Sequence, residues 1–174
     1  MGLVPGQYAA AHLRALYGRV TERTDEQAME WTQNAINCAS TLRPGGPFLF
    51  ASDHSYSTTA AIAYGREMST KIVSRRHDKP PLHLDRADNI EKRHPQEFYD
   101  TFVDLYLMGM GRCMVFNRGG FGTWALLIGY DSKCYQNQKT SSQGIGFKCN
   151  WTKPDQSLPL PQASGTPLFC EPMP

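Results

Sequence analysis

Apolar and polar residues alternate in blocks along the first 130 residues, and the blocks predict strands and helices in turn. A short continuous apolar run, typical of a strand covered on both faces, occurs at 48–51, and strands are also predicted at 8–12 and at the start of the segment 112–125. Apolar residues at helical spacing predict helices over about 24–42, 57–68 and 96–110. A further short strand is predicted at 71–74, and another apolar helix begins after the glycines near residue 120.

Two of these helices have a clear apolar face. The first opens with Thr24-x-x-Gln27, a capping-box pattern. Its buried face is predicted to consist of Ala28, Trp31, Ala35, Ile36, Ala39 and Leu42. In the helix over 96–110, the residues predicted to face inward are Phe98, Phe102, Leu105, Tyr106 and Met108.

Strands that alternate with helices at short spacing predict an α/β fold. We expect a Rossmann-like, mostly parallel sheet with helices on both faces. The 174 residues fit one domain, which we place at 1–135. Residues 75–95 are charged and contain three prolines, so they predict a long loop. Residues 136–174 are polar and Pro-rich without periodicity, and they predict an irregular C-terminal tail.

Composition narrows the class of partner. The net charge is only +2 and the basic residues are scattered, which argues against general nucleic-acid binding. No apolar run approaches the ~20 residues that a membrane span needs, and the N-terminus lacks a signal-peptide core.

The cysteines and histidines give no metal-site pattern. None of the five cysteines forms a CxxC pair, so no metal is expected. Cys134 and Cys149 flank a polar segment and could close it by a disulfide, and the glycosylation pattern Asn150-Trp151-Thr152 hints at a secretory lumen. Three histidines in the charged stretch are expected in solvated loops: His77, His83 and His94.

The segment over 112–125 carries the strongest chemical signal. It combines a strand, a Gly-rich turn and the start of a helix, an arrangement that aims backbone N–H groups at one point and suits a phosphate. The alternative is a tight packing turn in which Phe121 and Trp124 fill the core.

A second candidate phosphate contact is Arg14, in the pair His12-x-Arg14 just past the strand at 8–12. Ligands of open α/β sheets bind at the carboxyl ends of the strands, and an arginine there can hold a diphosphate with two hydrogen bonds. Ser52-Asp53 follows another strand in the same way. The alternative is that Arg14 is an ordinary surface arginine.

Together these segments resemble the C-terminal nucleotide-sugar domain of the GDP-fucose-dependent fucosyltransferases, which include α-1,2, α-1,6, protein-O- and plant xyloglucan enzymes. Residues 12–17 look like the family's His-x-Arg-x-x-Asp motif, and Phe50-Ala51-Ser52-Asp53 resembles its strand ending in Ser or Thr plus Asp. Residues 117–125 are similar to its strand, small-residue turn and Phe, and residues 104–108 to the Asp-x-x-Leu-Met run of the α-1,2 enzymes.

The resemblance implies roles for individual residues. Arg14 would be the catalytic residue, binding the β-phosphate and stabilising charge on the departing GDP. His12 would orient Arg14 or line the phosphate pocket, and Asp53 would accept hydrogen bonds from the guanine or ribose. The full substrate-binding set would be His12, Asp53, Asn117, Gly120, Phe121, Gly122 and Thr123.

The implied activity is inverting transfer of fucose from GDP-fucose to a glycan or glycoprotein acceptor in the secretory pathway, in the Golgi lumen. The resemblance implies no metal and no cofactor beyond the donor. The domain would form one half of a GT-B-type fold. Because the family's other half binds the acceptor, we expect a fragment, a truncated gene model or a domain that works with a partner.

The chain departs from the family pattern at two places. Tyr17 stands where the first motif usually has Asp, and Gly119 and Gly120 stand where relatives often have Ser or Thr. These departures leave two alternatives open. One is a non-catalytic nucleotide- or glycan-binding module, and the other is an α/β protein with no ligand at these motifs.

Overall fold

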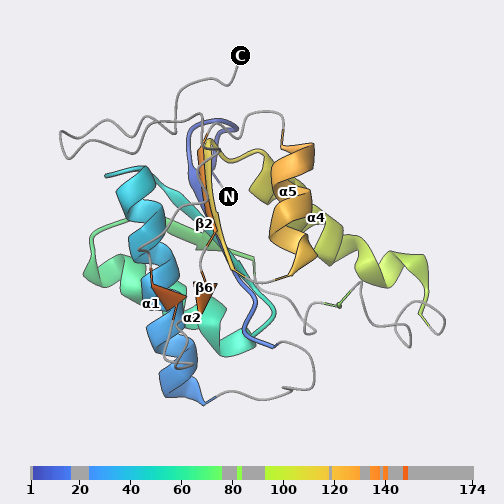
Figure 1. Cartoon of the computed structure of the whole chain (residues 1–174), viewed down its shortest axis with the longest axis horizontal. Helices are drawn as coiled ribbons and strands as arrows, with labels where there is room; N and C mark the ends of the chain where they lie inside the picture. The colour runs from blue at the N-terminus through green and yellow to red at the C-terminus, as the bar shows by residue number, and fades with distance from the viewer. Residues whose placement is uncertain are drawn as a thin grey trace.

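The computed structural model describes residues 2–16, 24–75, 82–83, 93–117, 119–129, 134–137, 139–140 and 147–148. A sheet of five parallel strands forms the centre, with helices on both faces (Figure 1). The strands are β1 (Ala9–Leu13), β2 (Phe48–Ser52), β3 (Ile72–Ser74), β4 (Cys113–Phe116) and β5 (Cys134–Asn137). The helices are α1 (Asp25–Leu42), α2 (Ser55–Glu67), the 3₁₀ helix η1 (Pro95–Phe98), α4 (Tyr99–Gly109) and α5 (Gly120–Ile128). The predicted α/β, Rossmann-like fold is confirmed.

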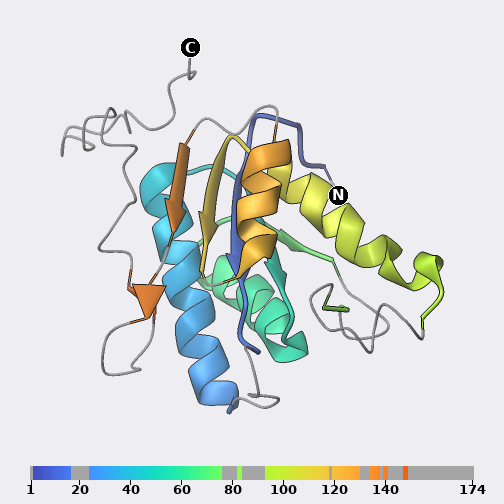
Figure 2. The same ribbon diagram turned by 45° about the vertical axis from the view of Figure 1, so that its right-hand side comes forward.

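The strand order alone predicts where a ligand would bind to this sheet. The order is β3-β2-β1-β4-β5, so the chain builds outward from β1 in one direction and then crosses back to β4 on the other side. Helix α1 covers one face of the sheet, and α4 and α5 cover the other (Figure 2). Ligands of such sheets bind where the strand order reverses, at the carboxyl ends of the strands. Here that point lies between β1 and β4.

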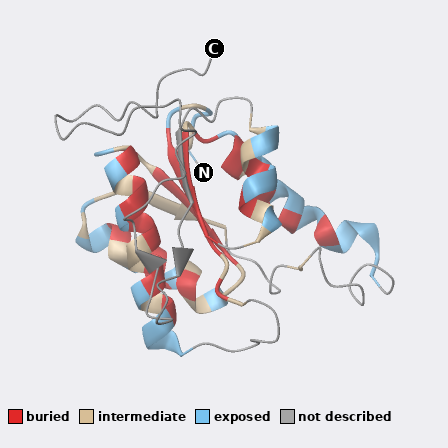
Figure 3. Ribbon diagram, viewed as in Figure 1, coloured by how far each residue is buried: buried red, intermediate tan, exposed pale blue. Residues whose placement is uncertain are grey.

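The core is divided by the sheet into two apolar layers. Strand β1 is buried along its whole length, and the central strands are buried throughout (Figure 3). Ala9, Ala11 and Leu13 pack with α1, whereas Tyr8 and Ala10 pack with the α4 and α5 side. This alternation follows from the two-residue period of a strand. By the same period His12 belongs to the α4 and α5 side.

Helix α1 forms as its pattern predicts. The Thr24 hydroxyl accepts a hydrogen bond from the Gln27 backbone N–H at 3.2 Å, which satisfies one of the unpaired N–H groups of the first turn. All six residues of the predicted apolar face are buried.

The inward face of α4 is narrower than predicted. Leu105 and Met108 are buried, as is Phe98 in the preceding η1. Phe102 and Tyr106 are 44% and 58% exposed, so their predicted inward orientation is wrong. Each lies one position beyond a buried residue, a rotation of about 100° around the helix axis, which turns it from the sheet toward solvent.

Ordered strands continue past residue 135. Strand β5 extends to Asn137, and β6 (Lys139–Thr140) pairs antiparallel with β7 (Phe147–Lys148). The predicted irregular tail therefore begins with strands, because β5 is too short and polar to give an apolar pattern. Residues 149–174 lie outside the described residues. The side chains of the expected Cys134–Cys149 pair also lie outside the described residues. Cys113 of β4 is buried and disulfide-bonded.

Gly122 brings α5 onto β4, and a methyl group there is expected to destabilise the fold. A Cβ at Gly122 would lie 2.5 Å from Cβ of Phe116, which is closer than packed carbon atoms approach. Gly122→Ala should therefore lower the free energy of unfolding by about 1–3 kcal/mol. The control is Thr123→Ala at the neighbouring exposed position, which should change the free energy of unfolding by less than about 0.5 kcal/mol. Urea denaturation of both variants tests this expectation, and equal effects would contradict it.

Candidate functional site

A pocket of about 290 Å³ lies at the carboxyl ends of β1 and β2. Its walls come from α4, from the N-terminus of α5 and from the short segment Leu82-His83. The residues that line it are His12, Arg14, Ala51, Ser52, Asp53, Leu82, His83, Thr101, Asp104, Leu105, Gly120, Phe121 and Trp124. Because β1 and α5 meet here, the pocket opens at the reversal point of the sheet.

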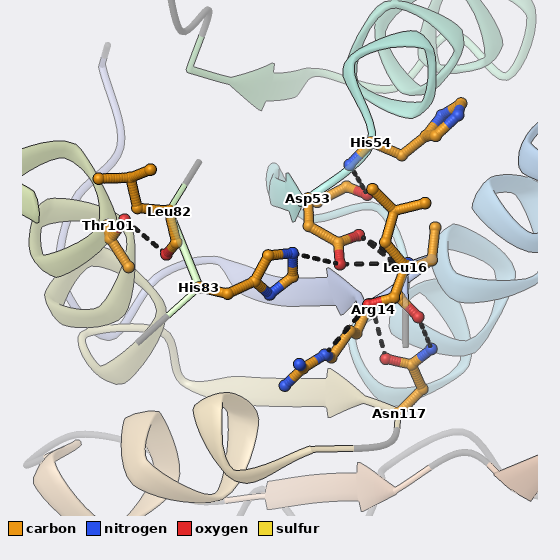
Figure 4. Close-up of polar contacts among 10 residues, drawn as sticks. Arg14, Leu16, Asp53, His54, Leu82, His83, Thr101 and Asn117 are labelled. Atoms are coloured by element: carbon orange, nitrogen blue, oxygen red, sulfur yellow. Dashed lines mark hydrogen bonds and ion pairs between the residues drawn. The ribbon is translucent and has the colours of Figure 1, made fainter. Parts of the chain in front are cut away.

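Arg14 is held at this point through hydrogen bonds to its backbone N–H and carbonyl groups. The Asn117 side chain, at the end of β4, accepts a hydrogen bond from the Arg14 N–H at 2.7 Å and donates one to the Arg14 carbonyl at 3.0 Å. Asn117 is 2% exposed, so this pair of bonds is shielded from water. The amide thus fixes the loop after β1 to the loop after β4 (Figure 4).

The Arg14 guanidinium packs against the glycine turn before α5. Gly119 has φ +99°, and a Cβ built on it would lie 2.8 Å from Nη1 of Arg14. The positive φ therefore favours glycine at this position, and a side chain there would displace the Arg14 guanidinium. Gly119 is also the N-cap of α5 and contributes no capping side chain. The first-turn N–H groups of α5 and the guanidinium together form a positive wall of the pocket.

Asp53 holds the backbone after β1 from the opposite side. Its Oδ1 accepts hydrogen bonds from the N–H groups of Ala15 at 2.7 Å and Leu16 at 3.3 Å, and its Oδ2 lies 3.2 Å from the Leu16 nitrogen. Burial raises the pKa of Asp53 to about 6, although these N–H groups and the charge of Arg14 favour the ionised form. Asp53 therefore shapes the Arg14 loop as well as lining the pocket.

His12 is a polar residue in a core position of β1. It is 6% exposed, and its ring lies 5.0 Å from the ring of Phe121. Within the described part of the chain, its Nδ1 has no hydrogen-bond partner. Burial, together with the nearby Arg14 and His83, lowers the pKa of His12 to about 3. The imidazole is therefore neutral at physiological pH.

His83 closes the pocket over Asp53. The Thr101 hydroxyl of α4 donates a hydrogen bond to the Leu82 carbonyl at 3.2 Å, which fixes this segment to the helix. The His83 Nε2 lies 3.6 Å from Oδ2 of Asp53, and the ring points toward that carboxylate in Figure 4. The His83 side chain is 13% exposed, so the expectation of a solvated loop histidine is wrong.

A partly buried ion cluster supports the α4 wall. Arg75, which follows β3, pairs with Asp100 and lies 3.3 Å from Oδ1 of Asp104. Because Asp104 is 6% exposed, the arginine compensates a carboxylate that would be costly to bury alone. The cluster fixes α4 to the end of β3 on the far side of the pocket.

The structure brings together five of the residues chosen from the motifs, namely His12, Arg14, Asp53, Gly120 and Phe121. The three others do not line the pocket. Asn117 binds the Arg14 backbone, Gly122 packs on Phe116, and Thr123 is exposed.

The residues chosen from the motifs did not include the pocket residues of α4, the segment Leu82-His83 or Trp124. The pattern of α4 carries a signal for its part of the wall, because Leu105 belongs to the predicted inward face and Asp104 precedes it. His83 carries no local signal, because its partner Asp53 is 30 residues away in the chain.

Comparison of the chain with family models, curated proteins and solved structures finds no match. In the described ranges, no three His, Cys, Asp or Glu side chains cluster as metal ligands would. No described helix combines the length and apolar content needed to span a membrane.

His12 is expected to make stability depend on pH. Its pKa falls from 6.5 to about 3 on folding, so below pH 6.5 the unfolded chain binds a proton that the folded protein does not. The stability associated with neutral His12 is present above pH 6.5 and is lost as the pH falls toward 3. His12→Leu removes this loss and the unpaired Nδ1. It should raise the free energy of unfolding by about 1 kcal/mol at neutral pH, and by about 2 kcal/mol more near pH 5.

Denaturant unfolding of both proteins at the two pH values measures the difference. Asp53 titrates in both the parent protein and His12→Leu, so its contribution cancels in the difference between their free energies of unfolding. A difference that stays constant with pH would contradict the buried, neutral state of His12.

Proposed function

We propose that the pocket binds GDP-fucose through its diphosphate and supports inverting transfer of fucose to a glycan or protein acceptor. The observation that carries the proposal is the placement of Arg14. Its guanidinium packs on Gly119 at the N-terminus of α5, inside a pocket at the reversal point of the sheet. The sequence resemblance indicates which nucleotide sugar would bind.

The electrostatics of the positive wall suit the chemistry of the transfer. When the bond between fucose and phosphate breaks, negative charge develops on the departing diphosphate. A guanidinium and helix N–H groups that already point at this position stabilise the charge without rearranging. Asn117 and Asp53 hold the Arg14 loop from two sides, so little ordering is required when the ligand binds.

Aromatic side chains provide a surface for the rest of the donor. Phe121 and Trp124, on successive turns of α5, both line the pocket next to the glycine turn. Nucleotide bases stack on aromatic rings with a contribution of about 1–3 kcal/mol each. The guanine would then lie along α5, with its phosphates at the helix N-terminus.

A second candidate function is a glycan-binding module without catalysis. The observation that favours it is Trp124, which lines the pocket and is 62% exposed. An exposed tryptophan beside a pocket offers an apolar face to a ring and a donor N–H to a hydroxyl group. In this case the chain would bind the donor or a glycan and leave the donor intact.

We also propose that the protein matures in the secretory pathway, in the Golgi lumen. The disulfide at Cys113 supports this location, because structural disulfides form in oxidising compartments and are rare in the cytosol.

Arg14 is expected to provide most of the phosphate affinity. Its charge-assisted hydrogen bonds should contribute about 1.5–3 kcal/mol, so Arg14→Ala should weaken GDP binding about 10- to 100-fold. Arg14→Lys should recover only part, because an ammonium cannot make the two parallel bonds of a guanidinium. The control is Arg66→Ala, which removes an exposed arginine of α2 outside the pocket and should bind GDP like the parent protein.

Calorimetric titration with GDP compares the four proteins. Equal affinity of the Arg14 variants and the parent would remove Arg14 from the site. Failure of the parent protein to bind GDP would overturn the proposed function.

A further inference from the structure

The pocket contains a second polar pair, close to the loop that carries Arg14. Asp53 and His83 face each other with 3.6 Å between Oδ2 and Nε2, and the side chains are 8% and 13% exposed. The two residues come from different parts of the fold, since Asp53 follows β2 and His83 belongs to a segment anchored on α4. A carboxylate beside an imidazole, both sheltered from water, is the arrangement that orients a histidine for proton transfer.

We propose that His83 is the general base of the transfer and that Asp53 is its positioning residue. This inference rests on the proposed function. A fucose acceptor is a hydroxyl group, and it must lose its proton as its oxygen attacks. His83 lies in the same pocket as Arg14, so His83 would receive the proton and Arg14 would stabilise the leaving group.

The other titratable groups that line the pocket are less suited to this task. Both oxygens of Asp53 are engaged by the backbone N–H groups of Ala15 and Leu16. Asp104 is paired with Arg75. Arg14 is a permanent cation, and His12, whose pKa is lowered to about 3, is too weak a base to take a proton near neutral pH. Among the described residues His83 is the remaining candidate.

The anchoring of His83 supports this role. The His83 Nε2 faces the Asp53 carboxylate at 3.6 Å, so we assign the proton to Nε2 and the lone pair to Nδ1. The hydrogen bond from Thr101 to the Leu82 carbonyl limits movement of the segment. When the imidazole becomes charged, the Asp53 carboxylate stabilises it, as the aspartate does for the histidine of a serine protease triad.

The step balances without another reactant. The acceptor oxygen forms a bond to C1 of fucose while its proton moves to Nδ1 of His83. The bond between C1 and the phosphate oxygen breaks, and its electron pair stays on the β-phosphate of GDP beside Arg14. His83 then releases its proton to solvent.

Turnover of GDP-fucose separates this role from binding. Water can replace the acceptor, so release of GDP from GDP-fucose measures the reaction of the full chain alone. His83→Gln should bind GDP within about threefold of the parent protein and release GDP about 100- to 10,000-fold more slowly. The control is His94→Gln, which changes an exposed histidine at the start of η1 and should leave both measurements unchanged.

His83→Ala with added imidazole distinguishes proton transfer from a structural role. Free imidazole should restore part of the lost turnover in this variant and should not accelerate the parent protein. Parent-like turnover of His83→Gln, with GDP binding intact, would overturn the assignment of His83 and leave the proposed function standing. GDP binding without any turnover in the parent would overturn it too, and would favour the non-catalytic module. If the parent protein does not bind GDP, the proposed function itself is overturned, and the role of His83 falls with it.

Discussion

The site depends on how two buried polar side chains hold three residues of backbone. Asn117 binds the N–H and C=O of Arg14, and Asp53 accepts the N–H groups of Ala15 and Leu16. Without these partners the chain would leave β1 with unpaired backbone groups in a sheltered environment, at a cost of about 1–3 kcal/mol for each group. The loop that carries Arg14 is therefore connected to β4 on one side and to β2 on the other.

This arrangement requires burial of the Asp53 carboxylate, which costs electrostatic free energy. The carboxylate is buried to hold the loop, and the raised pKa of about 6 records the free energy lost by removing it from water. The charge of Arg14 and the N–H groups of Ala15 and Leu16 recover part of that energy. The pocket is thus lined by the Arg14 guanidinium beside Gly119 and by the Asp53–His83 pair.

The sequence predicted the parts of the site that are local in the chain. The strands before Arg14, Asp53 and Asn117 are short apolar runs, and the parallel sheet brings their carboxyl ends to one edge. Individual roles at that edge depend on tertiary contacts that no local pattern encodes. Asn117 and Gly122 looked like ligand contacts, but the structure uses one to fix Arg14 and the other to seat α5 on Phe116. His83 looked like a surface residue because the partner that shelters it, Asp53, is distant in the sequence.

Gly119 shows how the residue at one position of a turn can depend on a neighbouring side chain. The fucosyltransferases that the sequence resembles often have a hydroxyl side chain in this turn, which would offer a donor to phosphate. In this chain any Cβ at position 119 would lie 2.8 Å from the Arg14 guanidinium, and the φ of +99° is unfavourable for any residue other than glycine. The guanidinium therefore occupies the space of the missing side chain. In the proposed function, the guanidinium would supply the charged donor to phosphate where a neutral hydroxyl would otherwise stand.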